Sequence, residues 1–225
     1  DLYYAIGNVI LKDSLRIIYG DSLSIEYKDN LMDRLNVASN ARIYNNQYLE
    51  IKNSSEKQFF QDKMEANYIF IEFDPNEQVD FILLSDMASA NFSIIRDQAI
   101  RGMNQVSGDS ISIDFIDNSI DAMNVMGGVE GQFIPDKNNK DISNTILYKA
   151  NHIYYNLNKE KTFLTDNAEV IYGMTTLQGG EIEADLNLNL VESRVKGDIL
   201  PSVSSDGEAP TYGNYMIFDL KTERG

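Results

Sequence analysis

Residues 105–129 read QVSGDSISIDFIDNSIDAMNVMGGV, and this stretch contains every signal that decides the fold. Ile111, Ile113 and Phe115 alternate with polar residues, which is typical of a strand with one buried and one wet face. Asp117-Asn118 then marks a turn, because Asn and Asp tolerate left-handed backbone and cap it with their side chains. A second apolar run follows at Met123/Val125 and ends at Gly127-Gly128, residues that suit a bend. The stretch therefore predicts a strand, a turn and a returning strand that bends.

The same alternation recurs along the chain at intervals of about 30 to 45 residues, a period typical of stacked supersecondary units. Each run follows a small residue, as Leu23 follows Gly20 and Ile69 follows Ala66. The pattern predicts an all-β protein built from repeated strand-turn-strand units and an antiparallel sheet. Turns are expected at residues 28–30, 74–76 and 158–160, returning apolar strands at Leu35/Val37, at Val79/Phe81/Leu83 and from Phe163 onwards, and bends at 38–41, 88–90, 127–128 and 167–168.

The segments between the units carry weaker signals. Residues 55–65 and 96–103 have apolar spacing for a turn or two of helix, and we expect loops with at most a short helix there. Residues 135–144 are polar and predict a long exposed loop. Because the alternation resumes at Leu147, residues 1–225 are expected to form a single continuous domain.

The composition excludes several classes of function. Asp and Glu number 35 against 19 Lys and Arg, for a net charge of −16, and no basic stretch offers a nucleic-acid surface. The chain has no Cys, which excludes thiol chemistry and Cys-ligated zinc. It has no apolar stretch long enough to cross a membrane and no signal peptide at its start, so we expect it to be a fragment of a longer protein.

Three catalytic signals are each weaker than a structural interpretation. Gly20-Asp21-Ser22-Leu23 spells the nucleophile motif of GDSL-type esterases, but His152 lacks the Asp three residues earlier that the motif needs. His152 is out of phase with Ile153, so we expect it on the wet face of its strand. Residues 136–141 have Lys where a calcium loop needs an oxygen ligand, and they lack the Gly of such a loop. Glycoside hydrolysis needs only a pair of carboxylates, and such pairs are inevitable among 35 Asp and Glu residues. We expect no enzyme, no cofactor and no metal site.

Short motifs resemble the repeats of the OstA/LptA family, which read roughly G-N-A-x-V-x-x-G followed by x-L-x-A-D-x-h-x-h. They are Ile6-Gly7-Asn8-Val9 with residues 19–23, and Thr165-Asp166-Asn167-Ala168-Glu169-Val170 with residues 177–185. Residues 105–129 are also similar to OstA-like periplasmic proteins and to the N-terminal region of LptD, and residues 213–225 to the last unit before the outer-membrane barrel of some LptD proteins.

The resemblance implies a β-jellyroll folded like a taco shell, in the periplasm and associated with the outer membrane. Its apolar interior would hold the acyl chains of lipopolysaccharide or another acylated glycolipid. Neighbouring Lpt-type jellyroll proteins would join it by addition of edge strands.

Two interpretations of the repeated apolar face stay open at this point. It is either a core packed by its own side chains, as in a structural or adhesive solenoid or sandwich, or an interior left open for acyl chains. If the interior is open, the alternating runs predict its lining as Leu23, Ile25, Tyr27, Ile69, Ile71, Phe73, Ile111, Ile113, Phe115, Ile153, Tyr155, Leu157, Ile182, Leu186, Met216, Phe218 and Leu220.

Overall fold

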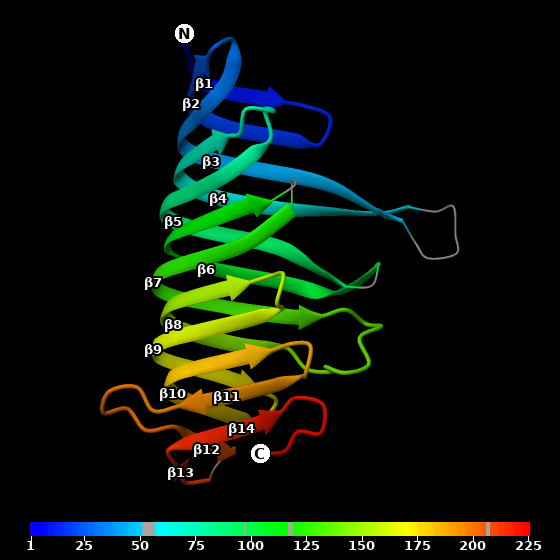
Figure 1. Cartoon of the computed structure of the whole chain (residues 1–225), viewed down its shortest axis with the longest axis vertical. Coiled ribbons are helices and arrows are strands. Elements are labelled where there is room, and N and C mark those ends of the chain that lie inside the picture. Colours follow the sequence, from blue (N-terminus) through cyan, green and yellow to red (C-terminus); the bar gives the residue numbers. More distant parts are fainter. Residues whose placement is uncertain (51–56, 97, 117–118, 206–207) are drawn as a thin grey trace.

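A computed structural model describes residues 1–50, 57–96, 98–116, 119–205 and 208–225. The described residues form one open antiparallel sheet of 14 strands and no helix (Figure 1), which confirms the all-β, antiparallel prediction. The path from β1 to β11 follows chain order and ends on β14, with β12 and β13 beside it. The strands are β1 Leu2–Lys12, β2 Arg16–Lys28, β3 Leu31–Glu50, β4 Lys57–Phe73, β5 Val79–Arg96, β6 Ala99–Ile116, β7 Ser119–Pro135, β8 Ile146–Asn156, β9 Lys161–Tyr172, β10 Thr175–Asp185, β11 Leu190–Arg194, β12 Ser202–Ser205, β13 Thr211–Tyr212 and β14 Tyr215–Asp219.

The sheet is folded over on itself along a single corner, seen at the left side of Figure 1. At this corner every odd-numbered strand from β1 to β9 inserts a bulge relative to its neighbours. Each bulge carries two consecutive residues with positive φ: Gly7-Asn8, Ser39-Asn40, Asp86-Met87, Gly127-Gly128 and Asp166-Asn167. A bulge bends its strand and increases the local twist, so a column of bulges folds the whole sheet. The bends expected at 38–41, 88–90, 127–128 and 167–168 lie at or beside this column.

Small residues on the even-numbered strands make the corner possible. A Cβ on Gly20 would lie 2.3 Å from Val37 Cγ1, and one on Gly108 would lie 2.9 Å from the Met126 carbonyl oxygen. At Gly179 it would lie 2.1 Å from Ser193 Oγ. The glycine that precedes an alternating run therefore lies where a neighbouring strand comes too close for a larger side chain.

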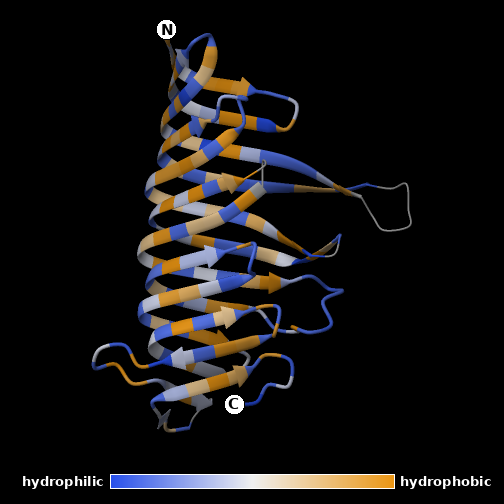
Figure 2. Ribbon diagram, viewed as in Figure 1, coloured by the Kyte–Doolittle hydropathy of each residue, from blue (hydrophilic) through white to orange (hydrophobic). Residues whose placement is uncertain are grey.

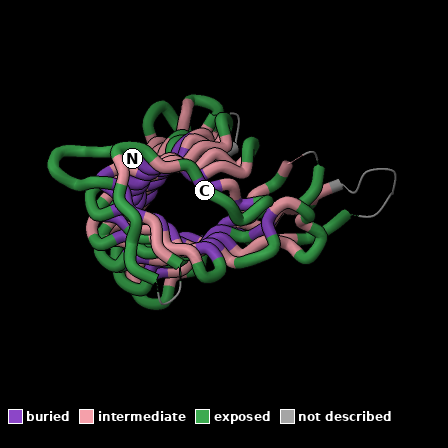
Figure 3. The backbone as a smooth tube through the Cα atoms, turned by 90° about the horizontal axis from the view of Figure 1, so that it is seen from below, coloured by how far each residue is buried: buried purple, intermediate pink, exposed green. Residues whose placement is uncertain are grey.

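The corner divides the sheet into two halves that face each other. The short-turn half includes residues 22–38, 68–85, 110–116, 119–126, 152–165 and 181–194, whose hairpin turns are tight where they are described. The long-hairpin half includes residues 41–50, 57–65, 88–96, 99–107, 129–135, 146–149 and 168–178. Buried residues line the inner side of the trace viewed along the stack (Figure 3), and apolar and polar residues alternate along the strands (Figure 2). Ile69, Ile111, Ile113 and Ile153 are completely buried between the halves.

The turns expected at 28–30, 74–76 and 158–160 are confirmed. Asp29 and Asn30 both have positive φ in the link between β2 and β3, the geometry of a tight hairpin turn. Asp74 Oδ1 accepts hydrogen bonds from the backbone N–H groups of Asn76 and Gln78. The turn expected at 117–118 lies outside the described residues.

The interpretation of 55–65 and 96–103 as loops with at most a short helix is wrong for the described residues. Residues 57–65 belong to β4, β5 continues to Arg96, and β6 begins at Ala99. Their backbones pair with neighbouring strands, as Met64 does with Ala90 and Met103 with Ser93. This ladder overrides a local helical spacing, because strand preference depends on the partners that the fold supplies.

The buried face of one returning strand, β5, is shifted by one residue from the predicted run. Val79 is buried, but the bulge at Asp80 places Ile82 and Leu84 in the core instead of Phe81 and Leu83. In β9, Leu164 is buried while Phe163 stacks on Tyr154, with ring centroids 6.2 Å apart. An extra or missing residue beside a turn moves a whole run to the other face.

Residues 136–145 link β7 to β8 without a strand. Ile142 is buried in the core, and the Ser143 N–H donates a hydrogen bond to the Tyr172 hydroxyl at 3.2 Å. Asp141 pairs with Arg101 and with Lys221 from the C-terminal segment. The exposed loop expected at 135–144 and the single-domain extent of 1–225 stay predictions.

Candidate functional site

A cavity of about 350 Å³ lies between the two halves of the folded sheet. Small-molecule sites typically occupy roughly 300 to 1,000 Å³ and are mostly apolar with a few polar groups. The exposed Asn158 belongs to the lining, so the cavity reaches the surface beside the turn between β8 and β9. The apolar lining comes from both halves and includes Phe92, Ile94, Phe115, Ile120, Phe133, Ile146, Leu157, Leu164, Leu186 and Val191.

The structure divides the predicted lining residues into three groups. Phe115, Tyr155, Leu157 and Leu186 line the cavity. Ile25 and Tyr27 border a second hollow of about 240 Å³ near the N-terminus, together with Asp1, Tyr3 and Asn30. The others belong to the packed core or lie against it, so their contact with lipid stays a prediction: Leu23, Ile69, Ile71, Phe73, Ile111, Ile113, Ile153, Ile182, Met216, Phe218 and Leu220.

Sequence reasoning missed the half of the cavity that comes from the long hairpins. Phe92 and Ile94 line it from β5 and continue the alternation of Ala88 and Ala90 beyond the corner. The sequence contains this continuation, but the small residues at 88–90 by themselves indicate only a bend. On this face of β5 the side chains change from Ala at the corner to Phe and Ile beyond it, where the two halves lie far enough apart to leave the cavity.

A buried carboxyl group lines the cavity on the long-hairpin half. Asp62 is 4% exposed, and its carboxylate accepts hydrogen bonds from Gln47 Nε2 at 2.7 Å and from the Ser93 N–H at 3.0 Å. Burial raises the pKa of Asp62 to about 6, against the opposing effect of these two donors. The group is therefore charged at neutral pH and makes this wall of the cavity polar.

A chain of hydroxyl groups crosses the interior next to the cavity. The Tyr155 hydroxyl, from the short-turn half, donates to the Tyr148 hydroxyl at 2.8 Å, which donates to Asn104 Oδ1 at 2.7 Å. Burial raises the pKa of Tyr155 to about 12 and raises that of Tyr148 well above its usual value, so both hydroxyls keep their protons. Tyr148 reaches Asn104 by lying across Gly131, where a Cβ would come within 2.3 Å of its ring.

The residues of the esterase motif are not assembled into a site. Ser22 lies on β2, where it pairs with Ile6 and Ala38, and His152 lies far along the sheet on β8. His152 is half-buried on the face opposite the buried Ile153, as expected, and its ring nitrogens lie 3.4 Å from Asn124 Oδ1 and from Thr165 Oγ1. The described residues contain no cluster of three or more His, Cys, Asp or Glu side chains placed to hold a metal ion.

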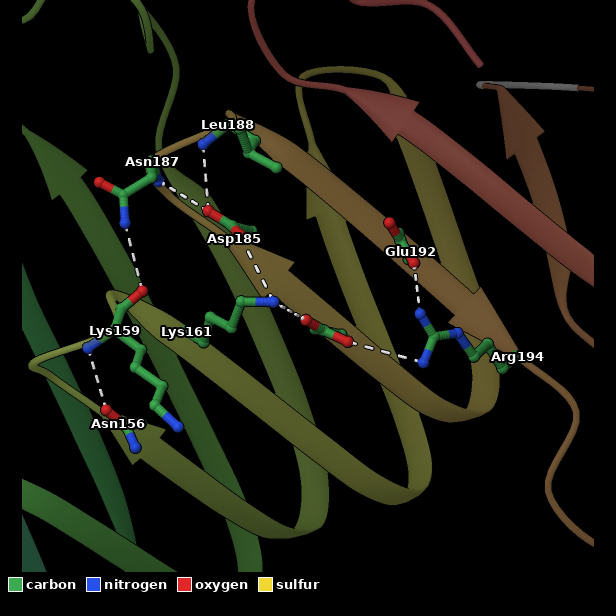
Figure 4. A network of polar contacts seen from close by, with 9 residues as sticks. Asn156, Lys159, Lys161, Asp185, Asn187, Leu188, Glu192 and Arg194 are labelled. Carbon is green, nitrogen blue, oxygen red and sulfur yellow. Dashed lines mark hydrogen bonds and ion pairs between the residues drawn. The ribbon is translucent and has the colours of Figure 1, made fainter.

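Charged residues on the outer face of β9, β10 and β11 form a ladder of ion pairs (Figure 4). Lys161 pairs with Glu183 and, at 3.5 Å, with Asp185. Arg194 contacts Glu192 at 2.6 Å and Glu183 at 3.6 Å. These contacts raise the pKa values of Lys161 and Arg194 and join the three strands from outside. We interpret the ladder as cross-strand stabilisation, because its carboxylates are paired and none lines the cavity or the second hollow.

No protein-family model matches the chain, and no curated protein sequence does. Among solved structures the chain is similar to LptH of Pseudomonas aeruginosa, described as the LptA homologous periplasmic component of a conserved lipopolysaccharide transport device. The two share 14% sequence identity, the match covers 68% of this chain and 92% of that one, and the TM-score is 0.47. No helix of the described residues is long and apolar enough to span a membrane.

Proposed function

We propose that this chain is a lipid-conduit domain that holds acyl chains during lipopolysaccharide transport in the periplasm toward the outer membrane. The observation that carries the proposal is the cavity between the two sheet halves, with apolar side chains from both and an opening beside the β8–β9 turn. An acyl chain gains about 0.8 kcal/mol for each CH₂ that leaves water. The lipid class and the compartment come from the resemblance of the repeats to the OstA/LptA family.

The same proposal includes partners that extend the sheet. The strand path begins at β1 and ends at β14, whose outer edge carries one bridge among the described residues, between Asp219 and Arg224. Leu2, Tyr4 and Ile6 on β1 are exposed, with Ile6 at 87%. An unpaired edge with apolar side chains is a template for strand addition. We therefore propose that β1 and β14 join neighbouring jellyroll domains, so that interiors of successive domains line up.

A photoreactive residue inside the cavity tests the lipid role directly. Phe115 is the best position, because the photoreactive phenylalanine analogue resembles it in shape and Phe115 lines the cavity. Ile113 is unsuitable, since it is completely buried by protein. Asp114, the exposed neighbour on the other face of β6, is the matched control.

We expect irradiation to attach lipopolysaccharide to the protein with the probe at position 115 and not with the probe at position 114. Equal labelling would indicate surface adsorption and contradict the proposal. No labelling at 115 would instead favour a closed structural module, for which the completely buried Ile69, Ile111 and Ile153 already provide a packed core.

A further inference from the structure

The outer edge of β14 is partly covered by the chain that follows it. After β14 the chain turns back beside the strand, at the red end of the ribbon in Figure 1. The Asp219 N–H donates a hydrogen bond to the Arg224 carbonyl at 2.7 Å, and the Arg224 N–H donates to the Asp219 carbonyl at 3.4 Å. A Cβ on Gly225 would lie 3.1 Å from the Ile217 carbonyl oxygen. Residues 221–225, here called the cover segment, therefore lie along the edge at which another strand would pair.

The cover segment is also attached to the β7–β8 link, at the end of the long-hairpin half. Lys221 Nζ lies 2.9 Å from Asp141 Oδ1, and Asn144 Nδ2 donates a hydrogen bond to Glu223 Oε1 at 3.2 Å. The link itself is held in place, because Ile142 is buried in the core. The segment therefore joins the two halves of the sheet, and it can leave the β14 edge only when these two side-chain contacts break.

Exposed polar contacts hold the cover segment, whereas β14 is anchored in the core. All five residues of 221–225 are exposed. Phe218 and Leu220 just before them are buried, and Phe218 packs against Tyr172 with ring centroids 6.3 Å apart. Exposed ion pairs contribute little to stability, because water screens them and long side chains lose freedom in forming them. The segment can therefore detach from the edge while β14 stays in the sheet.

We infer that the cover segment controls strand addition at β14, and that the strand it excludes is β1 of a second copy. The inference rests on the proposed joining of jellyroll domains and adds its regulation. No strand among the described residues pairs with the outer edge of β1, whose Leu2, Tyr4 and Ile6 are exposed. A chain with two free, complementary edges would join head to tail without limit. A cover on one of the two edges prevents this until it is released.

Cross-linking between copies tests the cover segment. A Tyr4→Cys protein (β1) is mixed with an Ile217→Cys protein (β14) under mild oxidation, and the initial rate of disulfide heterodimer formation is measured. In a second mixture the Ile217→Cys protein also carries Lys221→Ala, which removes the ion pair with Asp141. We expect the rate to rise roughly two- to fivefold, the change that corresponds to one exposed ion pair. Lys137→Ala, at an exposed position of the same link, is the matched control and should leave the rate unchanged.

A double variant separates the contacts from the charge. Lys221→Ala combined with Glu223→Ala removes one base and one acid and breaks both attachments to the link, so its heterodimer should form faster than that of Lys221→Ala alone. We expect unchanged circular dichroism spectra, because both positions are exposed. A heterodimer that forms at the same rate in every mixture would overturn the cover and leave strand addition standing. No heterodimer from any mixture would overturn strand addition and the cover together.

Discussion

Replacing Asp62 with Asn should make the protein's stability depend less on pH. In the unfolded chain the Asp62 carboxyl has a pKa near 3.8, and burial raises it to about 6 in the folded protein. The folded state therefore holds the proton more tightly than the unfolded state. Compared with a variant whose side chain is neutral at every pH, the wild-type protein is most stable below pH 4, and it loses this stability as the pH rises through about 6.

The size of this effect follows from the pKa difference of about 2 units, which corresponds to about 3 kcal/mol at 1.36 kcal/mol for each unit. Roughly half of this change in the free energy of unfolding occurs between pH 5 and pH 8. This pH range also avoids the low solubility expected near the isoelectric point of about 4.3. The amide introduced by Asp62→Asn would be neutral throughout and could still accept the hydrogen bond from the Ser93 N–H, so the packing should survive the substitution.

The assay is urea unfolding of the wild-type protein and Asp62→Asn at pH 5, 6, 7 and 8. We expect the free energy of unfolding of the variant, relative to wild type, to rise by about 1.5 kcal/mol over this range. Asp74→Asn is the control, because hydrogen bonds from Gln78 and Asn76 lower the pKa of Asp74 and its titration lies below the range. A constant difference between wild type and Asp62→Asn from pH 5 to pH 8 would refute the assignment of a buried charge to the cavity wall.

Two further predictions concern the edges and the corner. The chain has no Cys, so mixing a Tyr4→Cys protein (β1) with an Ile217→Cys protein (β14) should give a specific disulfide heterodimer under mild oxidation if these edges pair between copies. A mixture of Tyr4→Cys with Asn138→Cys, in the β7–β8 link, should not, and equal yields from both mixtures would argue against strand addition. Gly108→Val should lower the free energy of unfolding by roughly 1 to 3 kcal/mol, because its Cβ would lie 2.9 Å from the Met126 carbonyl and from Val125 Cγ1. Ser107→Val, at the exposed neighbouring position, should change it little, and equal effects in urea unfolding would show that the corner does not require a small residue.

The amino-acid sequence by itself determined the local structure of this protein. Alternation at Ile111, Ile113 and Phe115 specifies a strand with one buried face, since successive side chains point to opposite sides. Asp29-Asn30 and Gly127-Gly128 specify a turn and a bend because these residues adopt left-handed backbone readily. Each of these signals depends on a few neighbouring residues, and each can be read without knowing the partner strand.

The tertiary structure decided which of the apolar side chains close the core and which border space. Phe92 and Tyr155 meet only because the column of bulges folds β5 and β8 toward each other, and the single extra residue at Asp80 decides that Ile82 and Leu84 are buried instead of Phe81 and Leu83. The contacts of Asp62 with Ser93 and of Asn104 with Tyr148 likewise join residues 31 and 44 positions apart. Register and separation of the two halves are properties of the whole sheet, so no short stretch of sequence contains them.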